Sequence, residues 1–471
     1  MIPRIIIAGA QSGVGKTTVA VGLMNALARR GLRVQGFKAG PDYVDSQCHR
    51  WATGRPGRNL DTWLMTPQQV LDGFSRGTAW ADIAVIEGKR GLYDGIGGTD
   101  ETGSTAHLAK VLQAPVVLVL DAAASARSIA AVALGFKLLD PAVPLVGVIC
   151  NQVSGERHTQ TIREALNSVG IPLLGALMGD RRLRVPEDRM GLVLPGGEVS
   201  WPQWIAQAGD AVTGQVDLDQ VLALATAAPA PAEVATSNVL NAPAEVAAGG
   251  GPAPTVDPFA PSLAGRFKGL RLGVPLDEAF WFYYPDTFDL LTHWGVKLVY
   301  FSPLRDQDLP EKLHGLYLGG GFPERHGARL AANGSMLAAV QAAAAAGMPI
   351  LAEGGGYLYL LEELPDETGE VYAMAGVLRG LVRLQSRPQG VGYRTAQPGN
   401  VRGHLFHYTR VEASDGPPAW QLHLTGGGFE RADGGRRGSL LASYLHVHHA
   451  TQPAVMEEFL SGCLAFKAAA R

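Results

Sequence analysis

The sequence has few cysteines, no long apolar stretch and no marked excess of charge of either sign. Its three cysteines, Cys48, Cys150 and Cys463, lie far apart in 471 residues and form no CxxC pair. This spacing argues against a disulfide framework or a zinc site and favours a reducing compartment. No apolar run approaches the roughly 20 residues of a membrane span, and the apolar start is too short for a signal peptide. We therefore expect a cytoplasmic protein without a membrane partner.

The charge balance also limits the class of partner. The 40 Lys and Arg and 43 Asp and Glu residues give a formal net charge of −3, which provides no reason to expect a nucleic-acid partner. A hydrophobic content of 46% with 18% charged residues is typical of a globular protein. A chain of this length exceeds one ordinary core, so two or three domains are expected.

Residues 1–226 alternate short apolar runs with helix-like segments, which predicts βαβ units and a doubly wound parallel sheet. The predicted strands are Ile5–Ile7, Arg33–Phe37, Ile83–Ile86, Val116–Leu120 and Leu145–Ile149, and the predicted helices are Val19–Leu27, Ser128–Leu139 and Thr159–Val169.

Residues 227–263 have a different composition, because they are rich in Ala and Pro, contain a GGG run and lack Lys and Arg. We interpret them as a linker. A second α/β pattern occupies residues 264–471 and predicts a second doubly wound domain. Its predicted strands are Leu272–Pro275, Lys297–Phe301, Gly315–Leu318 and Pro349–Ala352, with a polyalanine helix around Ala338–Ala346.

A glycine-rich loop directly follows the first predicted strand. Ala10–Thr17 reads AQSGVGKT, which fits the pattern [AG]xxxxGK[ST] of a loop that holds nucleotide phosphates. Gly13 and Gly15 allow backbone N–H groups to converge on phosphate oxygens at a helix N-terminus. Lys16 is expected to reach the β- and γ-phosphates. The next two residues, Thr17 and Thr18, are expected at the nucleotide, with the Thr17 hydroxyl on Mg²⁺. The alternative is a chance glycine-rich turn.

Charged side chains follow two other predicted strands. Lys38, Asp42 and Asp45 follow one strand, and Glu87 ends another, with Asp94 seven residues later. Ligands bind beyond the carboxyl ends of parallel strands, so we expect these groups near the phosphate loop, with Glu87 as a second Mg²⁺ ligand. The alternative for the three aspartates is that they cap turns.

Several longer motifs extend over both halves. In the first half they are FKAGPDYVD, GRNLDTWLM, EGKRGLYDG and ICNQV; in the second they are AFWFYYPD, FSPL, LYLGGGFPE, GHLFHY and SYLHVHH. Together with the phosphate loop, they resemble the cobyrinic acid a,c-diamide synthase family, whose ATP-binding half is related to dethiobiotin synthetase. The resemblance covers nearly the whole chain outside the linker. It implies an N-terminal P-loop domain and a C-terminal class I glutamine-amidotransferase-like domain.

The resemblance implies a carbon–nitrogen ligase of cobalamin biosynthesis with ATP and Mg²⁺ as cofactors. The family activates the a and c acetates of a corrinoid, such as cobyrinic acid, and converts each acyl phosphate to an amide with ammonia from glutamine. By this resemblance Asn151 lies beside the adenine, while Lys38, Asp45 and Asp94 line the phosphate and acetate site. The expected Mg²⁺ ligands are Thr17, Glu87 and Asp45. Hydrogenobyrinic acid as substrate, a cobyric acid synthase activity and a homodimer all remain open.

The amidotransferase half departs from the family at its nucleophile. Family members have AECGG where this chain has AEGGG, so Gly354 occupies the position of the reactive cysteine. His446 matches the family's catalytic histidine, and the backbone near the GGG stretch matches its oxyanion site. Glycine is compatible with a strained strand-to-helix elbow, so the fold is expected to persist. A glycine cannot form the thioester, and the expected nitrogen donor is therefore free ammonia or ammonia from a partner rather than glutamine.

Other departures favour divergence of this half over an isolated change at Gly354. Leu405 replaces an acid in GHLFHY, Pro186–Leu192 lacks the histidine of its family motif, and Lys89 and Arg90 replace an apolar pair. They leave a second hypothesis open, namely a non-catalytic nucleotide-binding regulator.

Two further patterns have plainer interpretations. The histidines of SYLHVHH lack a third ligand at a spacing that would favour zinc. The aromatic run Phe280–Tyr284 is expected to pack in the core rather than to stack on a ring-shaped ligand.

Overall fold

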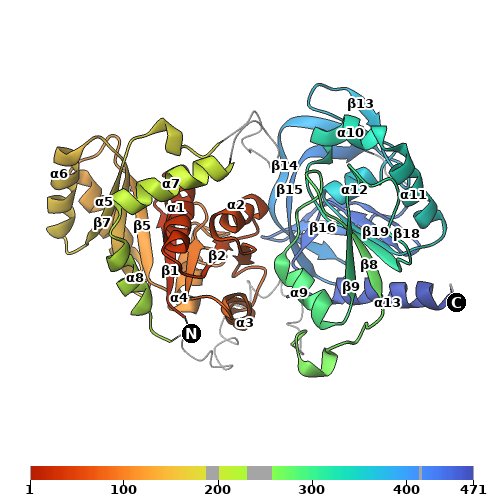
Figure 1. The fold of residues 1–471 in the computed structure, drawn as a ribbon, viewed down its shortest axis with the longest axis horizontal. Coiled ribbons are helices and arrows are strands. Elements are labelled where there is room, and N and C mark those ends of the chain that lie inside the picture. Colours follow the sequence, from red (N-terminus) through yellow and green to blue (C-terminus); the bar gives the residue numbers. More distant parts are fainter. Residues whose placement is uncertain (1, 187–200, 231–256, 413–415, 470–471) are drawn as a thin grey trace. The chain divides into compact units, whose positions relative to one another are not determined.

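The computed structural model describes residues 2–186, 201–230, 257–412 and 416–469. The chain forms two compact units, Met1–Leu240 and Asn241–Arg471, which are described separately below (Figure 1). Within the described residues, no helix combines the length and the apolar character needed to cross a membrane.

The first unit is built on a seven-stranded sheet in which every neighbouring pair is parallel. The strand order is β3-β2-β4-β1-β5-β6-β7, so β1 lies at the centre between β4 and β5. The strands are β1 Arg4–Gly9, β2 Val34–Ala39, β3 Arg58–Leu60, β4 Ile83–Glu87, β5 Val116–Asp121, β6 Leu145–Val153 and β7 Leu173–Met178. The central strands β1 and β4 are buried along their whole length, as a sheet covered on both faces requires.

Helices connect these strands. Helices α1, α2 and α7 pack against one another, while α3 packs on α4 and α5 on α6. The helices are α1 Lys16–Arg29, α2 Tyr43–Thr53, α3 Pro67–Thr78, α4 Thr105–Leu112, α5 Ser128–Leu139, α6 Glu156–Asn167, α7 Trp201–Gln215 and α8 Leu218–Thr226, with a 3₁₀ turn η1 Arg181–Leu183. The doubly wound sheet predicted for this half is confirmed. The short edge strands β3 and β7 were not predicted.

The second unit contains a six-stranded sheet of order β18-β19-β11-β10-β8-β9, in which only β18 runs antiparallel to its neighbour. Its strands are β8 Arg271–Pro275, β9 Lys297–Phe301, β10 Gly315–Leu318, β11 Ile350–Glu353, β18 Gly435–Arg437 and β19 Leu440–Ser443. Its helices are α9 Pro285–His293, α10 Gly327–Ala332, α11 Gly334–Ala345, α12 Gly355–Tyr359 and α13 Ala454–Ala469, with 3₁₀ turns η4 Pro261–Leu263 and η5 Pro323–His326. The predicted parallel strands and the polyalanine helix are confirmed.

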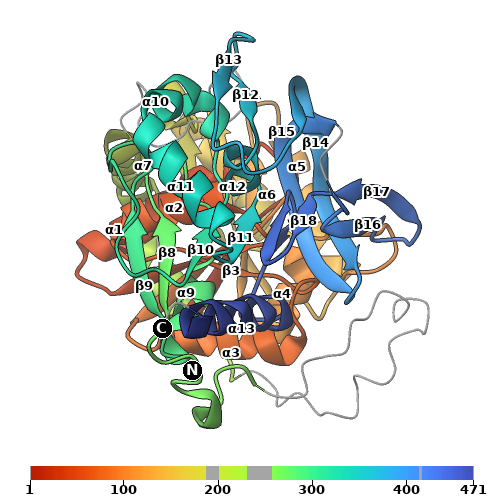
Figure 2. The ribbon, with the colours of Figure 1, turned by 90° about the vertical axis from the view of Figure 1, so that its right-hand side faces the viewer.

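The second unit also contains a five-stranded antiparallel sheet that the sequence reading did not anticipate (Figure 2). Its strands are β14 Leu381–Gln397, β15 Val401–Glu412, β16 Trp420–Leu424, β17 Phe429–Asp433 and β20 His446–Val447, and a separate pair is formed by β12 Glu363–Pro365 and β13 Val371–Ala373. The register of β14 against β15 shifts twice, around Gln389 and Gly392. Such bulges interrupt the period-two alternation by which a strand is recognised in a sequence.

Residues at the end of the predicted linker are folded onto the second unit. The Trp294 indole N–H donates to the Pro258 carbonyl at 2.9 Å, and a His293 ring nitrogen lies 3.0 Å from the Ala260 carbonyl. The middle of the predicted linker lies outside the described residues, so its limits stay a prediction. The aromatic run Phe280–Tyr284 packs in the core as expected, with Phe280 and Phe282 almost fully buried.

Candidate active sites

The phosphate loop has the backbone geometry that its glycines predict. It joins β1 to α1, and both Gly13 and Gly15 have positive φ, at 82° and 95°. A Cβ at Gly15 would lie 2.1 Å from the Asn151 side-chain nitrogen, so the position accepts only glycine. Asn151 donates to the Val14 carbonyl at 3.0 Å and thereby fixes the loop. Its predicted contact with adenine stays a prediction.

Lys16 is buried at the first turn of α1, and its ammonium donates to the Gln11 carbonyl across the loop at 3.0 Å. Burial, together with the nearby Lys38 charge, lowers the pKa of Lys16 to about 8. An ammonium inside a loop of this kind is placed to contact phosphate oxygens. Bound phosphate would favour the protonated, positively charged form of Lys16.

Glu87 lies at the centre of the polar cluster, where β4 ends. Its side chain is completely buried, and one oxygen accepts from the Thr17 hydroxyl at 2.7 Å and from the Lys38 ammonium at 3.0 Å. The other oxygen lies 2.8 Å from the His49 ring. Burial opposes ionisation, but the Lys38 charge and the His49 hydrogen bond together hold the pKa of Glu87 well below its usual value. Glu87 is therefore an ionised carboxylate held from both sides.

Lys38 connects this carboxylate to Asp45. Its ammonium lies 2.5 Å from an Asp45 oxygen and also donates to the Gly88 carbonyl. Burial and the negative charges of Asp42 and Glu87 raise the pKa of Asp45 to about 8, against the opposing effect of Lys38. The cluster thus holds more carboxylate charge than Lys38 alone can balance. We call Thr17, Lys38, Asp45 and Glu87 the phosphate-loop cluster.

Asp42 has the capping role that was the alternative for the aspartates. It precedes α2, and its carboxylate accepts from the Asp45 backbone N–H at 2.9 Å. Asp94 is exposed and accepts from the Gly91 N–H at 2.8 Å. Its loop is tied to the end of β1, because the Leu92 N–H donates to the Gly9 carbonyl. Asp94 therefore lies near the phosphate loop while closing a turn.

Two further residues refine the predicted site. Thr18 is buried, and its hydroxyl donates to the Leu183 carbonyl at 2.9 Å, so its assignment to the nucleotide stays a prediction. His49 was missed, although it lies one helical turn after Asp45 on α2, and that spacing places both residues on one face. In the described part of the chain, no group of three or more His, Cys, Asp or Glu side chains is arranged to hold a metal.

The second site is the elbow, Glu353–Gly355, where β11 turns into α12. Gly354 adopts φ 50° and ψ −112°, a conformation that residues with a side chain rarely adopt. A Cβ built there would lie 2.6 Å from both Cε1 and Nε2 of His446. A side chain at this position would therefore point directly at His446. The imidazole already occupies part of the space that such a side chain needs.

His446 is fully buried in β20 and stacks on the His404 ring with centroids 5.2 Å apart. Burial lowers the pKa of His446, and the Glu353 carboxylate opposes this effect. The glycine run after β10 lies against the same ring, because a Cβ at Gly320 would be 2.4 Å from His446 Cε1. His446 and the glycine run after β10 thus both lie next to Gly354 at the elbow, as the sequence predicts.

Glu353 was missed by the sequence reading. Its carboxylate accepts from the Val447 N–H at 3.1 Å and from the Tyr317 hydroxyl at 3.0 Å, and the His449 ring lies at 3.0 Å. These contacts fix the segment that carries His446 to the end of β11, directly before Gly354. No familiar spacing relates Glu353 to His449 in the sequence, so only the fold reveals this pairing.

The cysteine of the second unit, Cys463, lies away from the elbow. Cys463 lies on α13, and a Cβ at Gly315 would meet its sulfur at 2.5 Å. Gly315 lies at the start of β10, whereas the elbow follows the end of the neighbouring parallel strand β11. Cys463 therefore lies near the opposite ends of these strands from the elbow. Burial raises the pKa of Cys463 to about 12, which leaves it an unreactive thiol.

The remaining departures are placed as follows. Leu405 is fully buried in β15. The Lys89 ammonium lies 3.9 Å from Asp61, and Arg90 has a positive φ of 46°. Residues 187–192 of the altered motif at Pro186–Leu192 lie outside the described residues.

Comparison with known proteins assigns each half. Residues 5–192 match the CobQ/CobB/MinD/ParA nucleotide binding domain, and residues 271–454 match the CobB/CobQ-like glutamine amidotransferase domain. The first unit is accordingly a nucleotide-binding domain, and the second has the fold of a glutamine amidotransferase.

Full-length relatives agree. A hydrogenobyrinate a,c-diamide synthase from Streptomyces coelicolor is 40% identical, with 98% of each chain covered. Cobyrinate a,c-diamide synthases from Syntrophotalea carbinolica and Dehalococcoides mccartyi strain CBDB1 are 38% and 37% identical, with 98% and 97% of each chain covered. The chain therefore belongs to the cobyrinate a,c-diamide synthase family of carbon–nitrogen ligases.

Proposed function

We propose that this protein amidates the a- and c-acetate carboxylates of cobyrinic or hydrogenobyrinic acid at the expense of ATP, with ammonia as the nitrogen source. The observation that carries the proposal is the phosphate-loop cluster, in which the Lys38 ammonium lies 2.5 Å from Asp45 and 3.0 Å from Glu87 beside the phosphate loop. The full-length relatives named as a,c-diamide synthases support the choice of substrate.

The first step is phosphoryl transfer to an acetate. A carboxylate oxygen of the substrate attacks the γ-phosphorus, the bond to the β–γ bridging oxygen breaks, and ADP leaves. Lys16 supplies positive charge to the transferring group, where electrostatic stabilisation is the main source of catalysis. Binding of phosphate raises the pKa of Lys16 above its value of about 8 in the free protein and keeps it protonated.

Mg²⁺ fits the donor groups at this site. Thr17, Glu87 and Asp45 offer the hydroxyl and carboxylate oxygens that Mg²⁺ prefers, and Mg²⁺ sites in nucleotide enzymes commonly use only one or two protein groups together with phosphates. Burial and the negative charges of Asp42 and Glu87 raise the pKa of Asp45, and a bound cation would stabilise its ionised form. Bound Mg²⁺ would neutralise charge on the phosphates.

The second step forms the amide. The ammonia nitrogen attacks the acyl carbon, the bond from that carbon to the phosphate oxygen breaks, and inorganic phosphate leaves. The nitrogen loses a proton as the amide forms. Asp45 is already assigned to Mg²⁺, so the departing phosphate or a solvent molecule accepts that proton.

The geometry of the elbow supports the proposed nitrogen source. Gly354 has no side chain to attack glutamine, and Cys463 lies away from the elbow. We propose that free ammonia, or ammonia produced by a partner protein, enters the reaction instead.

A second candidate function is a non-catalytic, nucleotide-binding regulator of corrinoid synthesis. Gly354 favours it, because this half has lost its reactive group. The test is incubation of the full chain with ATP, Mg²⁺, ammonium and each macrocycle, followed by measurement of ADP and of amide by mass spectrometry. Amide formation supports the ligase. ATP binding without ADP release for both macrocycles supports the regulator and contradicts the ligase.

A further inference from the structure

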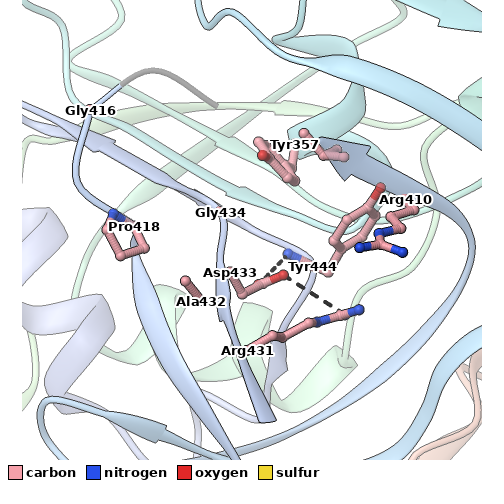
Figure 3. Close-up of a pocket in the computed structure, with 10 residues that line it drawn as sticks. Tyr357, Arg410, Gly416, Pro418, Arg431, Ala432, Asp433, Gly434 and Tyr444 are labelled. Atoms are coloured by element: carbon pink, nitrogen blue, oxygen red, sulfur yellow. Dashed lines mark hydrogen bonds and ion pairs between the residues drawn. The ribbon is translucent and has the colours of Figure 1, made fainter. Parts of the chain in front are cut away.

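The second unit contains a polar cavity of about 360 Å³ that the reaction above does not use (Figure 3). Tyr357 from α12, Arg410 from β15, Arg431 and Asp433 from β17, and Tyr444 line it. These residues come from segments far apart in the sequence. Strands β15 and β17 therefore provide two guanidinium groups and one carboxylate, and α12 and the segment after β19 add two phenol rings around one space.

The Arg431 guanidinium is held in place by His407 and lies 3.9 Å from the Asp433 carboxylate. Its Nη2 donates to Nε2 of His407 at 3.0 Å. The other ring nitrogen of His407 lies 2.6 Å from the Thr409 carbonyl, to which it donates, so Nε2 carries the lone pair. Burial and the Arg431 charge lower the pKa of His407 to about 3. His407 therefore orients the guanidinium as a neutral acceptor.

The one carboxylate that lines the cavity is already engaged elsewhere. Asp433 accepts from the Ser443 hydroxyl at 2.5 Å and from the Tyr444 N–H at 3.0 Å, and burial raises its pKa. Its nearer oxygen is 3.9 Å from Arg431, beyond hydrogen-bond distance. Among the described residues, the buried Arg431 Nε has no hydrogen-bond partner. That atom is closed to solvent, so it does not itself face the cavity.

Aromatic contacts make this frame rigid. The Tyr444 ring stacks on His407 with centroids 3.8 Å apart and an 11° tilt, and its hydroxyl lies 2.7 Å from the Thr409 hydroxyl. Tyr357 packs edge-on against Tyr444 at 5.4 Å. A preformed cavity with a few fixed polar groups is the usual form of a small-molecule site.

We propose that this cavity binds a small organic carboxylate, with its oxygens on Arg431 and Arg410. The carboxylates of Glu412 and Glu430 also act on Arg410 and Arg431, so we base the choice of ligand on hydrogen-bond geometry rather than on an excess of positive charge. A planar carboxylate matches the guanidinium fork. Tyr357 lies on α12, the helix that follows the elbow, but the proposal does not depend on the proposed ligase activity.

Calorimetric titration of the full chain with L-glutamate, L-glutamine, acetate and inorganic phosphate tests the proposal. At least one carboxylate is expected to bind more tightly than phosphate, and Arg431→Met is expected to weaken that binding at least tenfold. Arg437→Met removes the same charge from an exposed position on β18 and is expected to change nothing. Absence of carboxylate binding, preference for phosphate, or unchanged binding by Arg431→Met would overturn the proposal.

A second variant places a carboxylate inside the protein. Leu405 Cδ1 and Arg431 Nη2 lie 2.9 and 3.1 Å from the same point, the Cβ position of Gly390, so the two side chains are neighbours. Leu405→Glu should satisfy Arg431 internally and weaken binding as Arg431→Met does, with circular dichroism as the check on folding. His446→Ala tests the elbow as the binding place. Loss of binding in that variant, with normal binding by Arg431→Met, would assign the ligand to the elbow and contradict the proposal.

Discussion

The phosphate-loop cluster and the elbow differ in what their buried side chains are arranged to do. In the cluster, Glu87 is held by Thr17, Lys38 and His49, and the remaining negative charge at Asp45 is suited to a cation or a proton. At the elbow, the strained backbone persists, but the His446 ring lies in the space that a side chain at Gly354 would need.

The glycine conformation at 354, the glycine run and the Glu353 contacts maintain the shape of the elbow although residue 354 has no side chain. In the phosphate-loop cluster, by contrast, the side chains proposed for ATP chemistry lie within hydrogen-bond distance of one another. The chain is therefore expected to spend ATP without splitting glutamine, and the variants below test each half of that expectation.

The largest effect is expected at the phosphate loop. Lys16→Ala removes the buried ammonium and should lower ATP-dependent turnover by about 10²- to 10³-fold, the cost of losing one stabilising donor. The measurement is ADP release with macrocycle and ammonium. Lys137→Ala, on α5, is the control and should retain full turnover. Near-normal activity of Lys16→Ala would contradict the assignment of the loop.

Glu87→Gln is expected to lower both turnover and stability. The substitution removes the negative charge that Lys38 and His49 contact, which should lower the free energy of unfolding by about 1.5–3 kcal/mol near pH 7. The pKa of Glu87 is lowered by folding, so its stabilisation is present above the unfolded pKa of about 4.3 and is lost as pH falls below it. The gap in unfolding free energy between variant and parent should therefore narrow below pH 4. Glu164→Gln, exposed on α6, is the control. A pH-independent gap would show that charge is not the cause.

Gly354→Ala tests the crowding at the elbow. At position 354 alanine would have to adopt the existing positive φ, and its Cβ would lie 2.6 Å from His446. Together these effects should cost more than backbone strain alone, which is about 1–3 kcal/mol. Gly347→Ala is a matched control, because Gly347 also has positive φ, of 79°, but open space around its Cβ. Chemical denaturation should show the larger loss for position 354. Equal losses would mean that His446 moves aside freely.

Thr18→Val should have the smallest effect. The buried hydroxyl donates to the Leu183 carbonyl, so its loss should cost about 1 kcal/mol of stability. Turnover and the KM for ATP should stay the same, because the hydroxyl donates its hydrogen bond to Leu183 and not to the nucleotide. A marked rise in the KM for ATP would instead support the predicted contact of Thr18 with nucleotide.

The sequence predicted what depends on local pattern. The parallel strands and the convergence of Lys38, Asp45 and Glu87 followed from buried runs and from the rule that ligand groups lie at carboxyl ends of strands. The partners that hold these groups did not follow. His49 and Glu353 act through contacts set by the fold, and bulges in β14 obscured the antiparallel sheet. The crowding of His446 on Gly354 depends on the position of one ring, which no motif encodes.

The proposed use of ammonia in place of glutamine is tested most directly by comparing the two nitrogen donors. Full-length protein is supplied with ATP, Mg²⁺ and cobyrinic or hydrogenobyrinic acid, with either ammonium or glutamine, and both amide product and released glutamate are measured. Ammonium should support amide formation, while glutamine should give neither amide nor glutamate. Gly354→Cys should recover some glutamate release, limited by the shift that His446 must make. Robust glutamate release from glutamine by the unmodified protein would contradict the proposed use of ammonia, since it would require a nucleophile other than residue 354.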